Sequence, residues 1–222
     1  MILKRKLLTL LLLGSFSYSV YAQEATSIQA APVLQADSIR VLSPQEQQSL
    51  DNLDAQLKAK NYATAKKVII NENIPPISAS ERIKVFAEAG STPAMWLLAE
   101  QYRLANRMQD SANWTYTAFL GTRIDSSLCI NQQAPALEKN IISSFNLTVQ
   151  EARKEPSIMR DAIVFALEKQ QDIKDNDRDP EWICLLLDYP KGTNGVISKS
   201  QWSSIIQHQI KRFDEGTRRR EQ

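Results

Sequence analysis

Histidine is almost absent from this chain, and its scarcity limits the chemistry that the sequence supports. His208 is the only histidine among 222 residues, and no cysteine, aspartate or glutamate stands near it at metal-ligand spacing. A histidine of this kind is more commonly a surface or helix-end residue than a ligand. The sequence therefore predicts no metal site and no cofactor.

Motifs for nucleophilic and phosphate chemistry are lacking as well. The chain contains no G-x-S-x-G elbow, no H-E-x-x-H pair and no phosphate loop. Ser126 and Ser127 are better explained as the end of a helix than as nucleophiles. We therefore expect no catalytic residue, with a cell-wall hydrolase as the alternative because a single acid can suffice.

An acidic run, DNDRDPE over residues 175–181, matches a calcium loop only in part. Alternating carboxylates between Asp175 and Asp179 could point oxygens at one hard cation. The glycine that an EF-hand loop needs for its sharp turn is Pro180 here, and the bidentate glutamate at its end is Leu186. The run is therefore interpreted as a solvated acidic loop.

Also missing is an apolar run of the roughly 20 residues that a bilayer span needs. Residues 7–13 come nearest, and they follow a basic segment and precede small residues at Val20 and Ala22. This order is typical of a secretory signal peptide. We therefore predict that residues 1–22 are removed by cleavage after Ala22, that no membrane span remains, and that the protein is periplasmic or secreted.

A charge excess of either sign is lacking once the signal peptide is removed. The whole chain holds 27 Lys and Arg against 25 Asp and Glu, and residues 23–222 hold 24 against 25. A near-neutral protein is a poor general binder of polyanions, so we expect no nucleic-acid partner. The basic end, residues 216–222, is interpreted as a flexible tail.

Cysteine is scarce but even in number, since only Cys129 and Cys184 occur. In an exported chain such a pair favours a disulfide. Closing a loop of this length would stabilise the fold by about 4 kcal/mol in the chain-entropy model. Two buried free thiols are the alternative, and a cysteine nucleophile is disfavoured because His208 lies in a different predicted helix.

What the chain does contain is helical periodicity. Residues 23–42 are rich in Ala, Gln and Ser and are interpreted as a flexible leader. A capping box formed by Ser43, Pro44 and Glu46 then begins a single helical domain over residues 43–215. Helices are predicted over residues 44–60, 62–71, 78–89, 94–105, 111–121, 133–145, 151–169 and 200–214.

The predicted fold is therefore mostly all-α and built of antiparallel helical hairpins, with one exception near residues 182–198. Residues 182–187 are largely apolar and fit a short strand or, equally, a buried helical turn. Residues 191–198 contain Gly192 and Gly195 and are typical of a turn. This segment is the expected irregular part of the domain.

Two of the predicted helices combine large and small residues at regular spacing. The first carries Ala94, Leu98, Ala99 and Tyr102, and the second carries Trp114, Ala118, Phe119 and Gly121. This pattern resembles the bacterial Sel-type relatives of tetratricopeptide repeats over about residues 94–121, and more weakly over residues 50–70. The resemblance implies closely packed, repeat-like hairpins. The turn Ala105–Met108 lacks the usual glycine, and a non-repeat helical domain is the alternative.

Helical spacing separates core residues from candidate binding residues. The predicted core comprises Tyr62, Ala65, Leu98, Tyr102, Trp114, Ala118 and Trp202. Tyr116 projects away from Trp114 and Ala118 on the same predicted helix. Tyr116 and Arg123 are therefore the candidate binding residues.

These features favour an exported, non-catalytic helical protein that binds another protein in the periplasm or cell envelope. A more specific option is an immunity-type inhibitor that blocks a secreted effector. An envelope adaptor with tetratricopeptide-like repeats and a cell-wall hydrolase are the alternatives. The first hypothesis fits the absent catalytic motifs and the near-neutral charge best.

Overall fold

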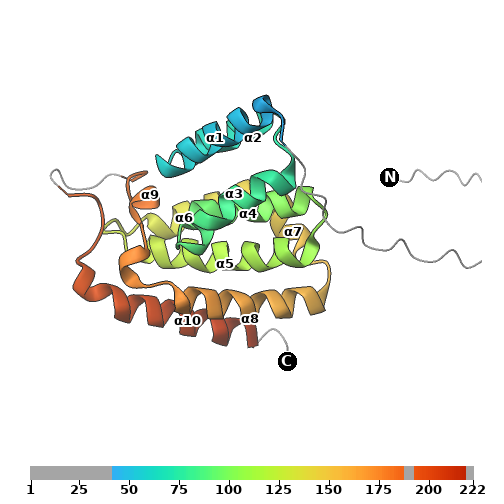
Figure 1. The fold of residues 1–222 in the computed structure, drawn as a ribbon. Coiled ribbons are helices and arrows are strands. Elements are labelled where there is room, and N and C mark those ends of the chain that lie inside the picture. Colours follow the sequence, from blue (N-terminus) through green and yellow to red (C-terminus); the bar gives the residue numbers. More distant parts are fainter. Residues whose placement is uncertain (1–41, 188–192, 219–222) are drawn as a thin grey trace, which may run out of the picture. The chain divides into compact units, whose positions relative to one another are not determined.

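The computed structural model describes residues 42–187 and 193–218. Within these ranges it contains ten α-helices, two 3₁₀ helices and no β-strand, which confirms the predicted all-α fold (Figure 1). The described residues from Leu42 onward belong to one compact unit. The predicted signal peptide, nearly all of the predicted leader and residues 219–222 lie outside the described ranges.

Four turns connect the first five helices, and all four use the same backbone geometry. The helices are α1 (Pro44–Lys58), α2 (Tyr62–Asn71), α3 (Pro76–Glu88), α4 (Thr92–Leu104) and α5 (Met108–Ser127). Each turn holds one residue with a positive φ, at Lys60, Asn73, Gly90 and Asn106. The next amide donates back into the finished helix, as from Ser91 N to Phe86 O at 3.1 Å. This Schellman geometry satisfies carbonyls at the helix end, and asparagine at Asn106 adopts it where the repeat pattern would have glycine.

The starts of these helices follow from their capping residues. Ser43 N donates to Glu46 Oε2 at 2.9 Å, and Glu46 N donates to Ser43 Oγ at 3.2 Å, so the predicted capping box is present. α3 begins at Pro76, earlier than the predicted start at residue 78. Proline suits the first position of a helix because the amide hydrogen that it lacks has no intrahelical partner there.

The long helix α5 lies at the centre of the described domain. It packs against α4, α6 (Ala134–Ser144), α7 (Asn146–Glu151), α8 (Pro156–Asp172) and α10 (Trp202–Arg218). In Figure 1, α5 lies between α4 and α8, and α10 lies beside α8. Gly121 permits this close approach, because a Cβ there would lie 2.8 Å from Thr92 Oγ1 and 2.9 Å from Gln170 Nε2.

The described residues of the irregular segment, 182–187 and 193–198, contain no strand. Residues Glu181–Cys184 form a single helical turn, α9, which is one of the two structures that the sequence allowed. Within the described ranges, β-type pairing is limited to an isolated bridge between Cys129 and Val196. The structure pairs Cys129 with Cys184 in a disulfide, with 5.2 Å between the Cα atoms. The disulfide ties the end of α5 to α9.

The remaining short elements are 3₁₀ helices. The first, Asp175–Asp177, lies inside the acidic run, and the second, Lys199–Gln201, leads directly into α10. α10 continues to Arg218, so residues 216–218 of the predicted tail are helical. Its buried residues Trp202, Ile206, Ile210 and Phe213 recur at helical spacing and form the apolar side that packs on α5 and α8.

Most of the predicted core residues are buried. The buried members are Ala65, Leu98, Tyr102, Trp114, Ala118 and Trp202. Tyr62 is half-buried, and its hydroxyl accepts a hydrogen bond from Ser91 Oγ at 2.6 Å. The structure is helical but gives no support for repeats of the Sel type, so that resemblance stays a prediction.

Candidate binding site

A small pocket opens where α5, α8 and α10 meet the turn after α7. Its volume is about 120 Å³. The apolar lining consists of Phe119, Met159, Ile163 and Phe213. Of these, Ile163 and Phe213 are buried and belong to the same hydrophobic cluster. The base of the pocket is therefore part of the core.

The polar lining of the pocket is dominated by cations. It contains Tyr116 and three arginines, Arg123, Arg153 and Arg212. We call this site the arginine-rimmed pocket. Both residues that the sequence singled out for binding, Tyr116 and Arg123, line it.

Helical spacing explains how α5 contributes to this pocket. Tyr116, Phe119 and Arg123 stand at positions i, i+3 and i+7, so they share one face of the helix. The Arg123 guanidinium carbon lies 5.3 Å from the centroid of the Phe119 ring. A cation held over an aromatic face is attracted to the electron-rich ring, which restrains the Arg123 side chain.

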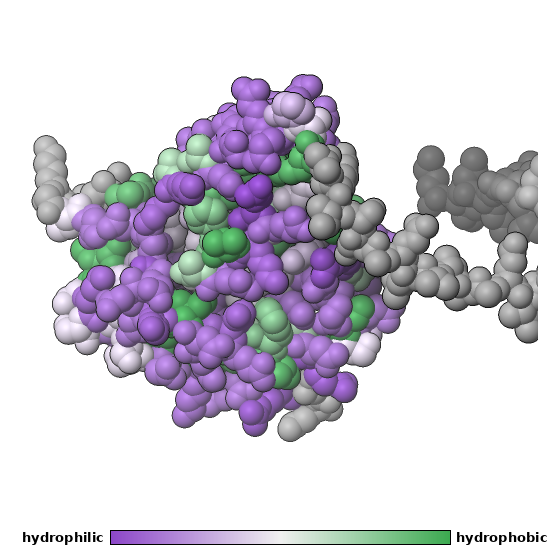
Figure 2. Space-filling view, in the orientation of Figure 1, coloured by the Kyte–Doolittle hydropathy of each residue, from purple (hydrophilic) through white to green (hydrophobic). Residues whose placement is uncertain are grey.

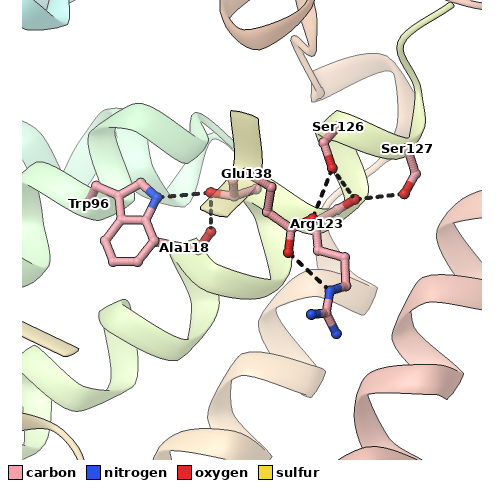
Figure 3. A network of polar contacts seen from close by, with 7 residues as sticks. Trp96, Ala118, Arg123, Ser126, Ser127 and Glu138 are labelled. Carbon is pink, nitrogen blue, oxygen red and sulfur yellow. Dashed lines mark hydrogen bonds and ion pairs between the residues drawn. The ribbon is translucent and has the colours of Figure 1, made fainter. Parts of the chain in front are cut away.

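A buried carboxylate on α6 orients Arg123 further. Arg123 Nε donates to Glu138 Oε1 at 3.3 Å, and Ser126 Oγ donates to Glu138 Oε2 at 3.3 Å (Figure 3). Figure 3 also shows the Ser126 and Ser127 hydroxyls donating to the Arg123 carbonyl oxygen at the end of α5. These two serines therefore donate hydrogen bonds to a backbone carbonyl in the last turns of α5. Glu138 balances the charge of one of the three arginines.

The other two arginines lack such a partner. Arg153 and Arg212 are exposed, and neither forms an ion pair with any residue in the described parts of the chain. Several charged residues near them in sequence pair with one another: Lys154 with Glu151, and Lys211 with Glu215. The pocket therefore combines an apolar base with uncompensated positive charge.

A second polar cluster lies inside the protein, on another face of α5. Asp125 Oδ2 accepts hydrogen bonds from Thr92 Oγ1 at 2.7 Å and from Trp182 Nε1 at 2.8 Å. Burial raises the pKa of Asp125, while the charge of Arg178 and these hydrogen bonds act in the opposite direction. Because Asp125 is only 2% exposed, its carboxyl is out of reach of an external substrate.

Arg178 completes this cluster from the acidic run. Its Nη2 donates to the Gln170 carbonyl oxygen at 2.9 Å, and the residue is 5% exposed. Burial lowers the pKa of Arg178, and the charge of Asp125 opposes that shift. The interpretation of the run as wholly solvated is therefore wrong at Arg178. We assign the Asp125–Arg178 cluster the structural role of holding residues 178–184 against α4 and α5.

The other sequence features form no site in the described parts of the chain. His208 is exposed on α10. Asp179 of the acidic run forms an ion pair with Lys60. Among the residues with described positions, no group of three or more His, Cys, Asp or Glu side chains could hold a metal ion. The helices of residues 42–187 and 193–218 also include none that is long and apolar enough to cross a membrane.

Sequence reasoning missed Arg153, Arg212 and most of the apolar base. Arg153 and Arg212 lie in separate segments, and only the packing of α8 and α10 on α5 brings them near Arg123. A local signal existed at Arg212, which directly precedes Phe213, the last buried apolar residue of the last helix. Nothing in the sequence connects that signal to α5.

Comparison of the chain with protein-family models, with curated proteins and with solved structures finds no match in any of the three. The function is therefore argued from the pocket itself.

Proposed function

We propose that this chain is an exported, non-catalytic helical protein that binds another protein through the arginine-rimmed pocket. The observation that carries the proposal is the combination of an apolar base, Tyr116 and three arginines in one pocket. Arginine and aromatic residues are enriched in protein–protein interfaces and supply many of their strongest contacts.

The size of the pocket favours a side chain of a partner over a free small molecule. Its volume is about 120 Å³, whereas small-molecule sites commonly measure about 300–1,000 Å³. A cavity of about 150 Å³ holds one benzene ring. The arginine-rimmed pocket therefore suits one aromatic or aliphatic side chain that anchors a larger partner.

The surface around such an anchor need not be strongly apolar. On the face drawn in Figure 2, hydrophobic residues occur as small, separate patches among hydrophilic ones. Non-obligate interfaces are about as apolar as the rest of a protein surface, and a few residues carry most of their energy.

The cellular compartment belongs to the same proposal. The signal-peptide pattern of residues 1–22 and the Cys129–Cys184 disulfide both suit an oxidising compartment outside the cytoplasm. The partner is then a protein of the periplasm or envelope. In the most specific form of the proposal, that partner is a secreted effector and the chain is its immunity-type inhibitor.

Photo-crosslinking in intact cells tests the proposal. A photoreactive phenylalanine analogue replaces Tyr116 at the pocket, and a matched variant carries it at Val85, which is 65% exposed on α3 and lies outside the pocket. We expect one envelope protein to be crosslinked reproducibly from position 116 but not from position 85. That purified partner should bind the wild-type chain, and Tyr116→Ala should weaken binding about tenfold.

Other outcomes of these experiments would contradict the proposal. Adducts from neither position, or the same adducts from both, would contradict binding through this pocket. Release of cell-wall fragments by the purified chain would favour the hydrolase alternative. For the immunity form, co-expression with the captured partner should remove its toxicity, and continued toxicity would exclude that form.

A further inference from the structure

We infer that the partner inserts an apolar side chain that is flanked by two carboxylates. The arginine-rimmed pocket then binds an acidic segment with a hydrophobic anchor. This inference rests on the proposed function and specifies its partner. Three features of the pocket support it: the apolar base, the rim charges that are unpaired among the described residues, and the restraint of Arg123.

The base selects an apolar group. Phe119, Met159 and Phe213 supply two aromatic rings and a thioether. The Phe119 and Phe213 rings lie 6.2 Å apart in a tilted arrangement. Methionine adapts to irregular shapes and makes favourable contacts with aromatic groups. A polar side chain placed here would lose its hydrogen bonds to water and gain none from this base.

The rim selects negative charge beside that group. Arg153 and Arg212 have no ion-pair partner among the described residues, and Glu138 balances Arg123. Two positive charges therefore remain for a ligand. Arginine binds a carboxylate through two parallel N–H donors, and such charge-assisted hydrogen bonds are stronger than neutral ones. Two carboxylates on the partner would match the two uncompensated arginines.

Arg123 orders one edge of the pocket before binding. Its guanidinium is held by Glu138 Oε1 at 3.3 Å and by the Phe119 ring at 5.3 Å from the centroid. A side chain that is already restrained loses little conformational entropy when a partner packs against it. Arg123 therefore forms a fixed wall, and Arg153 and Arg212 are the arginines that engage the partner's carboxylates.

The crosslinking experiment also tests this inference. The partner peptide joined to position 116 is identified by mass spectrometry. We expect a segment in which an aromatic or aliphatic residue has at least two Asp or Glu residues within about four positions. A segment without acidic residues overturns the inference but leaves the proposed function in place. Absence of any protein adduct overturns both.

Charge reversal provides the quantitative test with the captured partner. We expect Arg153→Glu/Arg212→Glu to weaken binding about 100-fold, because each lost charge-assisted contact accounts for about a factor of ten. The control is Lys67→Glu/Lys174→Glu, which alters the net charge equally at exposed positions outside the pocket. Its affinity should stay within about threefold of wild type.

Three results would overturn the inference. Equal losses in both double variants would show that only the overall charge matters. Wild-type affinity in Arg153→Glu/Arg212→Glu would show that these arginines bind no carboxylate. Native mass spectrometry that finds a fatty acid or a second copy of this chain as the occupant, instead of the acidic segment, would assign the pocket to another ligand.

Discussion

Two faces of α5 each carry an aromatic and a charged residue, but one face is buried and the other is half-exposed. Trp114 and Asp125 stand eleven positions apart on one face, where both are buried, at 4% and 2% exposure. Tyr116 and Arg123 stand seven positions apart on another face, and both remain half-exposed beside the pocket. Aromatic and charged residues on the buried face stabilise the fold, whereas those on the half-exposed face line the pocket and can contact a partner.

Truncation of the aromatic residue on each face should show the largest difference between the two faces. Trp114 packs edge-on against Phe165, with 5.7 Å between ring centroids. Trp114→Ala should lower the free energy of unfolding by about 3–5 kcal/mol, because the change leaves a large cavity. Tyr116→Ala should cost about 1 kcal/mol. Urea unfolding measures both, and equal losses would contradict the assignment of the two faces.

Removing the buried acid is expected to have the next largest effect. Asp125→Ala leaves Thr92 Oγ1 and Trp182 Nε1 without their acceptor and removes the larger of the two carboxylate charges that act on the buried Arg178. We expect a loss of about 3 kcal/mol in unfolding free energy. The control is Asp214→Ala, which removes an exposed ion pair with Arg218 and should cost less than about 1 kcal/mol.

The pH dependence of the unfolding free energy tests the burial of Asp125 independently. Because burial raises the pKa of Asp125, the folded protein holds this proton more tightly than the unfolded chain does. Unfolding free energy should therefore fall as pH rises from about 4, the unfolded value, through the folded-state pKa. Asp125→Asn should lack this component. Parallel pH profiles for wild type and variant would show that Asp125 does not titrate in this way.

The exposed arginines should have the smallest effect on stability. Arg153→Ala and Arg212→Ala remove no ion pair among the described residues, so each should change the unfolding free energy by less than about 0.5 kcal/mol. Each should nevertheless weaken partner binding about tenfold. A stability loss as large as that of Asp125→Ala would place these arginines with the structural residues.

Local patterns predicted most of the helices, but of the long-range relations only the Cys129–Cys184 disulfide was predicted. The capping box at Ser43 and the bounds of α2, Tyr62–Asn71, match the structure because caps and turns act on neighbouring residues. α5 extends to Ser127, beyond the predicted end near Gly121, because packing on α8 favours helix over the local glycine signal. Tertiary packing therefore overrides propensity within this helix.

The candidate site was predictable only in part, for the same reason. Tyr116 and Arg123 could be singled out because one helix places them together. The burial of Arg178 within an acidic run, and the approach of Arg153 and Arg212 to Arg123, depend on segments far apart in the chain. Hydrophobic periodicity indicates which face of a helix is buried, but it does not identify the helix that covers that face.

Gly216 permits a direct test of whether the arginine-rimmed pocket accepts an anchor from a partner. A Cβ at this exposed, pocket-lining glycine of α10 would meet no atom within 4 Å. Gly216→Ala should stabilise the helix by about 0.5–1 kcal/mol and leave binding intact, whereas Gly216→Trp should occupy the mouth of the pocket.

The decisive measurement is the affinity of the crosslinked envelope partner for these two variants by titration calorimetry. The account predicts that Gly216→Trp binds at least about tenfold more weakly than Gly216→Ala, with both variants at least as stable as wild type. Equal affinities of the two variants would contradict it.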